Sequence, residues 1–135
     1  MIAITADLLT HVKTIDEQHQ KLIEHLNNVE LLGTKSHTQE ETEKALNFLG
    51  DYIIEHFSNE EALMLESNYP KYDWHHNWHQ SYIAKFQLLQ DEYIKNGPSD
   101  EFSHILNEFL IKWILTHIKN VDVALGAHIK EHLKI

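Results

Sequence analysis

The sequence predicts an all-α protein, an antiparallel up-down four-helix bundle with an N-terminal arm and a short C-terminal helix. Apolar residues recur at alternating steps of three and four, which is typical of the inward face of bundled helices. No stretch alternates as a β-strand would, and only 4 glycines and 2 prolines interrupt the 135 residues. Helices joined by such short breaks pack as antiparallel neighbours.

Each helix has an expected start and end. The first two begin at capping boxes, TIDE at 14–17 and TQEE at 38–41, in which a threonine precedes a glutamate by three positions. Gly33, the pair Tyr69-Pro70 and the NGPS run at 96–99 are the breaks between helices. The expected helices therefore cover residues 15–32, 39–66, 71–95 and 99–118, and a shorter helical piece follows Val121.

The composition suits a single globular domain spanning residues 1–135, with 42% apolar residues to form a core. The net charge of −10 argues against nucleic acid or an anionic membrane as a partner. The chain has no cysteine, so any metal ligand would be a nitrogen or an oxygen atom. The N-terminal segment has neither a charged leader nor a long apolar run, and we expect a cytoplasmic protein without a transmembrane segment.

Polar residues interrupt the apolar seam of every expected helix. Of the twelve histidines in the chain, five fall on these seams together with one glutamate: His19, His56, Glu60, His75, His79 and His117. A lone histidine there would usually be a core residue bonded to a backbone carbonyl. Six such groups without partners would each cost about 1–3 kcal/mol, against a total stability of roughly 5–15 kcal/mol. A metal ion removes this conflict, so the pattern favours a metal site.

The bundle topology brings these residues to one end, because a site late in one helix faces a site early in the next. The pairs His56/Glu60 and His75/His79 are each spaced i, i+4, so both members can reach one centre. Asp122 follows His117 by five positions and would lie about 140° around an ideal helix. It joins the site only if the backbone bulges or the helix ends there.

Five imidazoles and two carboxylates exceed what one ion can hold and suit two six-coordinate ions. By ligand softness the metal could be iron, zinc or copper. His76 stands where a zinc peptidase helix would need its catalytic glutamate, which disfavours that class. Ferritin-like di-iron sites use Glu-x-x-His pairs, whereas this chain has His-x-x-x-Glu. We expect the other seven histidines at the surface, with His76 alone close enough to support a ligand from outside.

Four motifs occur in series: IDEQHQKL around His19, HFSNEEALM from His56, HHNWH from His75 and HIKNVD from His117. Over essentially the whole chain this series resembles the hemerythrins, and most closely the single-domain bacteriohemerythrins. The resemblance implies two Fe ions in a non-haem, oxo- or hydroxo-bridged centre. His75, His79 and His117 would complete one iron, His19 and His56 would ligate the other, and Glu60 and Asp122 would bridge.

The resemblance also implies reversible O2 binding, for transport, storage or delivery, by a protein that is not an enzyme. Leu22, Phe57, Trp113 and Ile118 match family positions that line the O2 pocket, although ordinary core packing is the alternative for them. Two other functions stay open: a di-iron oxidoreductase acting on O2, NO or peroxide, and an oxygen sensor with a separate partner. We expect a monomer or weak oligomer, and an unidentified protein acceptor is compatible with that role.

Overall fold

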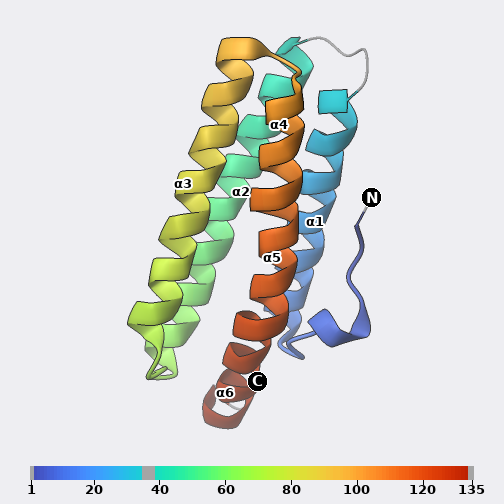
Figure 1. Ribbon diagram of the computed structural model, residues 1–135. Helices are drawn as coiled ribbons and strands as arrows, with labels where there is room; N and C mark the ends of the chain where they lie inside the picture. Colours follow the sequence, from blue (N-terminus) through green and yellow to red (C-terminus); the bar gives the residue numbers. More distant parts are fainter. Residues whose placement is uncertain (1, 35–38, 134–135) are drawn as a thin grey trace.

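The computed structural model describes residues 2–34 and 39–133, which form four long helical rods (Figure 1). Three of the rods are the continuous helices α1 (Lys13–Thr34), α2 (Gln39–Glu66) and α3 (Tyr72–Asn96). The fourth rod consists of α4 (Asp100–His104), the π-helical segment η2 (Ile105–Ile111), α5 (Lys112–His117), the π-helical segment η3 (Ile118–Asp122) and α6 (Val123–Leu133). The N-terminal arm contains a short 3-10 helix, η1 (Ala6–Leu8).

The rods close into an antiparallel four-helix bundle. α1 contacts α2, α2 contacts α3, α3 contacts the fourth rod, and α4 returns to α1. Neighbouring rods run in opposite directions, and α6 projects beyond the lower end of the others (Figure 1). The predicted fold class is therefore confirmed. No helix within the described ranges is both long enough and apolar enough to cross a membrane.

Two hydrophobic clusters fill the bundle at different heights. The larger cluster includes Leu22 and Phe57, and the smaller one includes Ile15 and Met64. Along α1, His19 therefore lies between a residue of the small cluster and a residue of the large one. Along α2, Glu60 lies between Phe57 and Met64 in the same way. A polar layer thus separates two apolar layers near the lower end of the bundle.

The start of α1 differs from the prediction. The helix begins at Lys13, so Thr14 lies inside it and TIDE is not its cap. The Asp16 carboxylate instead accepts the backbone N–H groups of Thr10 at 2.8 Å and His11 at 3.1 Å, which ties the arm to the first turn. α1 also continues through Gly33 to Thr34.

The predicted cap at Thr38 lies outside the described residues. The fourth rod does begin with a side-chain cap, because the Ser99 hydroxyl accepts the Phe102 N–H at 3.0 Å.

The fourth rod is longer than predicted. We expected a helix ending at residue 118 and a separate piece after Val121, but the rod continues without a break to Leu133. Its inward seam, predicted at Phe102, Leu106, Phe109, Trp113 and His117, is wrong at one position. Phe109 is 38% exposed and Leu110 is buried in its place. The reason is η2, since a π-helical turn holds more residues than an α-helical turn and moves the inward position onward.

Candidate metal centre

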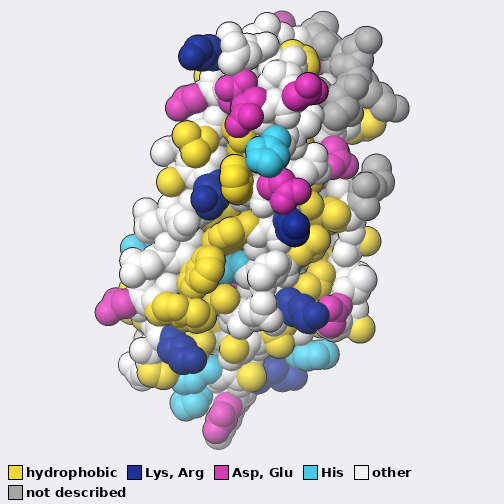
Figure 2. Space-filling view, in the orientation of Figure 1, with side chains coloured by type: hydrophobic (Ala, Val, Ile, Leu, Met, Phe, Trp, Pro, Cys, Tyr) yellow, Lys and Arg dark blue, Asp and Glu magenta, His cyan; other side chains and the backbone are white. Residues whose placement is uncertain are grey.

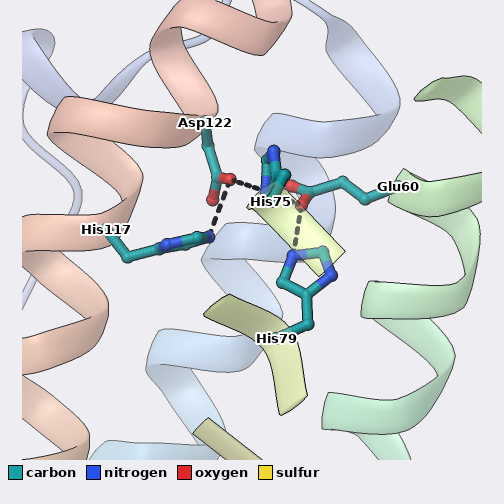
Figure 3. A group of neighbouring side chains, drawn as sticks. All are labelled: Glu60, His75, His79, His117 and Asp122. Atoms are coloured by element: carbon teal, nitrogen blue, oxygen red, sulfur yellow. Dashed lines mark hydrogen bonds and ion pairs between the residues drawn. The ribbon is translucent and has the colours of Figure 1, made fainter. Parts of the chain in front are cut away.

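The structure brings the seven predicted site residues together. α1 supplies His19, α2 supplies His56 and Glu60, α3 supplies His75 and His79, α5 supplies His117 and η3 supplies Asp122. All seven are buried, with exposed fractions between 0% and 2%. Figure 3 shows the side chains of Glu60, His75, His79, His117 and Asp122 pointing toward one another from α2, α3 and the fourth rod. Four rods therefore contribute to one polar cluster.

The π-helical segment η3 explains how Asp122 reaches this cluster. In a π-helix the hydrogen bonds run between residues five apart, as seen where the Val123 N–H bonds to the Ile118 carbonyl. A wider turn places residues i and i+5 on one face, and Asp122 Oδ1 lies 3.0 Å from His117 Nε2. The backbone bulge that the spacing required is present.

Each carboxylate divides its two oxygens between two sets of imidazoles. Asp122 Oδ2 lies 3.0 Å from His19 Nε2, while its Oδ1 lies 2.9 Å from His75 Nε2. Glu60 Oε2 lies 3.4 Å from His19 Nε2 and 3.3 Å from His56 Nε2. Its Oε1 lies 3.3 Å from His75 Nε2 and 3.0 Å from His79 Nε2. Both carboxylates thus face two centres at once.

The ligand atoms fall into two groups, each compact enough to hold one metal ion. One group contains Glu60, His75, His79, His117 and Asp122, and the other contains His19, His56, Glu60 and Asp122. Glu60 and Asp122 belong to both groups. The arrangement has the form of a two-ion centre with shared carboxylates and unequal numbers of donors.

The protein alone does not satisfy these donors. Nine buried side-chain atoms among the described residues have no hydrogen-bond partner, and all nine belong to the cluster: both ring nitrogens of His19, His75 and His117, together with His56 Nε2, Glu60 Oε2 and Asp122 Oδ1. Such groups normally find partners, since leaving one bare costs about 1–3 kcal/mol. Metal ions of the imidazole- and carboxylate-binding class fit this donor set, because they take the lone pairs that the protein leaves free.

Within the cluster, neighbouring charged and hydrogen-bonding groups shift the pKa values in the direction opposite to burial. Burial alone would lower the pKa of His19 and His75, but Asp122 and Glu60 raise it to about 10 and about 9. Burial and the Glu60 charge would raise the pKa of Asp122, yet the His117 and His19 imidazoles hold it well below its usual range. Burial likewise opposes ionisation of Glu60, whose pKa His56 and His19 hold well below its usual range. The carboxylates therefore stay ionised and attract cations.

Two supporting residues were missed by the sequence reasoning. Gln18 Oε1 lies 2.8 Å from His56 Nδ1, and Glu61 Oε2 lies 2.8 Å from His79 Nδ1. Such contacts to the outer ring nitrogen orient an imidazole that uses its other nitrogen as a ligand. Their only signal in the sequence is that each adjoins a site residue, Gln18 next to His19 and Glu61 next to Glu60.

His76 has a more distant role than expected, since it contacts Glu61 and not an imidazole of the cluster. Its Nδ1 lies 2.6 Å from Glu61 Oε1, so it reaches the cluster through Glu61.

The four predicted O2-pocket residues lie in the large hydrophobic cluster beside the polar layer. Leu22, Phe57 and Ile118 are buried and Trp113 is partly buried. The Phe57 ring stacks on His79 with centroids 3.9 Å apart, and the Trp113 ring stacks on His117 with centroids 4.9 Å apart. Aromatic rings thus cover two of the histidines, and the role of the four residues toward O2 stays a prediction.

Comparison with known proteins gives consistent matches. The family described as the hemerythrin HHE cation binding domain matches residues 10–129. A bacteriohemerythrin of Stenotrophomonas maltophilia is 29% identical over 127 residues, covering 94% of this chain and 80% of that protein. A bacteriohemerythrin of Methylococcus capsulatus is 26% identical over 121 residues, covering 90% of each. A wild-type hemerythrin crystal structure superposes with a TM-score of 0.82 at 24% identity, covering 96% of this chain and 97% of that one.

Proposed function

The chain belongs to the hemerythrin family, and from that membership we propose that it binds O2 reversibly at a non-haem di-iron centre. The proposed ligands are His19, His56, Glu60, His75, His79, His117 and Asp122. One observation carries this assignment: each of the two carboxylates faces both groups of imidazoles, while nine buried atoms of the same residues have no hydrogen-bond partner among the described residues. Two shared cations would take up the six of these atoms that face the centre: Nε2 of His19, His56, His75 and His117, Glu60 Oε2 and Asp122 Oδ1.

The unequal donor groups support different roles for the two ions, only one of which would bind O2. One group offers five protein donors and the other offers four. If an oxo or hydroxo group added one shared donor, a six-coordinate ion held by His19, His56, Glu60 and Asp122 would keep one position free. That position is where we place O2. When bound, a pair of iron(II) ions supplies the two electrons that reversible O2 binding requires.

The protein's own contribution is to hold the ligands and to exclude proton donors. Gln18 and Glu61 orient two of the imidazoles, and Leu22, Phe57, Ile118 and Trp113 present only apolar or aromatic surface toward the layer. An O2 position lined by such side chains, without a general acid or base, would favour release of O2 over its further reduction. Transport, storage or delivery of O2 follows more readily from such a site than catalysis does.

Iron content and optical spectra test the proposal. Purified protein is expected to hold two irons per chain, and its visible charge-transfer absorption should appear in air and disappear under an anaerobic reductant over repeated cycles. Glu60→Ala removes a donor from both groups and should abolish the band, whereas Glu66→Gln, an exposed position on the same helix, should leave it unchanged. A band that never reverses would overturn the proposal.

Irreversible oxidation with release of a product would instead favour a di-iron oxidoreductase acting on O2, NO or peroxide. An O2-dependent protein partner would favour a sensor. We retain a monomer or weak oligomer, a protein acceptor and a cytoplasmic location as further proposals, which size-exclusion chromatography, pull-down and cell fractionation would test.

A further inference from the structure

All three tryptophans of the chain lie in one cluster between the metal centre and the surface. Trp74 and Trp78 belong to α3, and Trp113 belongs to α5. The Trp78 ring lies 5.4 Å from the Trp113 ring and 6.2 Å from the Trp74 ring, measured between centroids. These separations are within the range of direct aromatic contact. The three indoles therefore form an unbroken series.

The inner end of the series touches a proposed iron ligand. Trp113 stacks on His117 with centroids 4.9 Å apart and an interplanar angle of 10°, and Trp78 lies 6.1 Å from the same imidazole. At the outer end, Trp74 is 47% exposed, whereas His117 is 2% exposed. The indoles thus connect a buried ligand with solvent through ring contacts alone.

The surface over the series is open and apolar. A cavity of about 350 Å³ is lined by Trp74, Trp78, Trp113 and His117, with Glu108 and Lys112 among its polar residues. Figure 2 shows a band of hydrophobic side chains over the lower half of the face between α3 and α5, with charged side chains around it. Small molecules in solution can therefore approach the outer indoles.

The aromatic series has a side branch that ends inside the protein. Tyr82 stacks on Trp113 with centroids 4.6 Å apart, and its hydroxyl donates to the Leu110 carbonyl at 3.2 Å. A phenol that loses an electron must also lose its proton, and a backbone carbonyl does not take one up. Burial also raises the pKa of Tyr82 far above its usual value. Among these rings, an oxidised Trp113 therefore regains its electron more easily from Trp78 than from Tyr82.

We propose that Trp113, Trp78 and Trp74 form a one-electron pathway that discharges oxidising equivalents from the metal centre to the surface when peroxide reacts there. Indole is among the side chains most easily oxidised, and a proposed O2-binding iron site exposes the nearby core to peroxide. Without an outlet, the oxidation would remain on Trp113 and Tyr82 in the core. This pathway rests on the proposed iron site but adds a protective function to it.

Each passage along the series moves one electron inward from the surface to the centre. Trp113 gives one electron to the oxidised centre, Trp78 replaces it, and Trp74 replaces the electron lost by Trp78. Oxidised Trp74 releases its Nε1 proton to water, and the Lys71 ammonium, 5.6 Å from its ring, favours that loss of positive charge. A one-electron donor such as ascorbate returns the electron, and water returns the proton. Two such passages and two solvent protons convert one H2O2 into two H2O.

Peptide mass spectrometry after peroxide treatment tests the pathway. In the iron-loaded protein, oxidised indole products should concentrate on Trp74, and ascorbate should suppress them. The metal-free protein treated in the same way should show little oxidation at Trp74, because no oxidant forms at the site. Equal oxidation of Trp74 with and without iron would overturn the proposal, since solution oxidants would then account for it.

Trp78→Phe breaks the series in the middle while keeping an apolar ring. We expect Trp74 oxidation to fall several-fold and oxidation of Trp113 and Tyr82 to rise, with a freeze-quenched radical signal shifting from tryptophan at the surface to the core. Tyr52→Phe, which removes an oxidisable ring on α2 outside the cluster, should leave the wild-type pattern. Unchanged Trp74 oxidation in Trp78→Phe would refute the pathway.

The two proposals fail in different ways. Loss of the reversible O2 band in the wild-type protein would overturn the di-iron carrier, whereas a normal band in Trp78→Phe with unchanged Trp74 oxidation would overturn the pathway alone. Should Trp78→Phe fold poorly, Trp74→Phe alters only an exposed ring. In that variant the oxidised product should move inward to Trp78, and its absence there would contradict the series.

Discussion

Glu61 shows how much a single residue beside the centre can control. Its two oxygens lie 2.8 Å from His79 Nδ1 and 2.6 Å from His76 Nδ1, and the Tyr72 hydroxyl donates to it at 3.3 Å. Burial would raise the pKa of Glu61, but the hydrogen bonds from His79 and His76 lower it. An ionised carboxylate therefore faces the outer nitrogen of His79, keeps the proton there and leaves Nε2 free for a metal.

Glu61→Gln should weaken iron binding without unfolding the protein. The amide has one acceptor oxygen where the carboxylate has two, so it cannot serve both histidines in the same way. Loss of such a support typically reduces metal affinity about 10–100-fold. Chelator competition followed by iron analysis measures the effect. Glu66→Gln, an exposed change on the same helix, is the control, and wild-type affinity in Glu61→Gln would contradict the role.

The metal-free protein should lose stability as the pH rises. Because Asp122 and Glu60 raise the folded-state pKa of His19 to about 10 and of His75 to about 9, their protonated forms stabilise the fold fully below the ordinary imidazole pKa of about 6.5. That contribution disappears as the pH rises through the folded-state values. The depressed pKa values of Glu60 and Asp122 have the opposite consequence, since their contribution is lost in acid.

Urea unfolding of metal-free protein at about pH 6, below the ordinary imidazole pKa, and at about pH 9.5, above the folded-state pKa of His75, measures this effect. The free energy of unfolding should be lower at the higher pH. His19→Gln should flatten the change, while His104→Gln, an exposed substitution, should keep the wild-type slope. Stability that is constant or rises toward the alkaline value would show that the cluster does not hold these protons. The affinity for iron should rise with pH instead, because imidazole must lose its proton to become a ligand.

At the scale of elements, the two π-helical segments mark the limit of sequence reasoning. Regular spacing was sufficient to predict that both members of each i, i+4 pair on α2 and α3 reach one centre, because α-helical geometry places them on one face. The inward positions of Asp122, five residues after His117, and of Leu110 in place of Phe109 depend on a wider helical turn. Wider turns have no clear sequence pattern, so these positions could not be predicted from spacing. For Asp122, the family resemblance supplied what the spacing left open. The start of α1 was missed because Asp16 ties the arm from inside the helix.

The arm is held against the fourth rod by a close approach at Gly126. A Cβ atom at this position would lie 2.5 Å from the Thr10 carbonyl oxygen and 2.8 Å from Thr10 Cβ. Gly126→Ala should therefore destabilise the protein by about 1–3 kcal/mol, because the backbone of the arm must move. Within an ordinary helix the same change would stabilise by about 1 kcal/mol.

Urea unfolding distinguishes the two outcomes, because they differ in sign. Ala127→Gly, an exposed position one residue later, reports the helix propensity alone and should cost about 1 kcal/mol. A stabilised Gly126→Ala protein would show that the arm does not rest on α6.

At the scale of the whole molecule, the sequence was sufficient to predict the bundle and the end at which the polar residues gather. Apolar periodicity and short breaks determine a four-helix arrangement, and antiparallel order then places late and early positions side by side. What the sequence could not show is the layered core, in which the polar residues separate the cluster of Ile15 and Met64 from that of Leu22 and Phe57. Contacts such as Glu61 with His79 depend on side-chain positions that periodicity does not determine.

This layering makes the lower end of the bundle depend on metal. Without metal, the six buried atoms that face the centre lack the bonds that an ion would form, which weakens that end, while the upper end keeps an uninterrupted core. Local opening should therefore be more frequent in the lower half, and amide hydrogen exchange should be faster there than around Leu46, Tyr93 and Phe102. Free iron(II) about a thousandfold above its dissociation constant should add about 4 kcal/mol of stability.

Hydrogen exchange with mass spectrometry, with and without iron(II) under anaerobic conditions, tests this dependence. Iron should slow exchange most in the segments that carry the ligands, namely residues 15–22, 53–64, 72–82 and 114–126, and should reduce the difference between the two ends. Calcium at the same concentration is the control, since it prefers oxygen ligands and should change little. If iron slowed exchange equally at both ends, the metal would stabilise the bundle as one cooperative unit and the weak lower end would be ruled out.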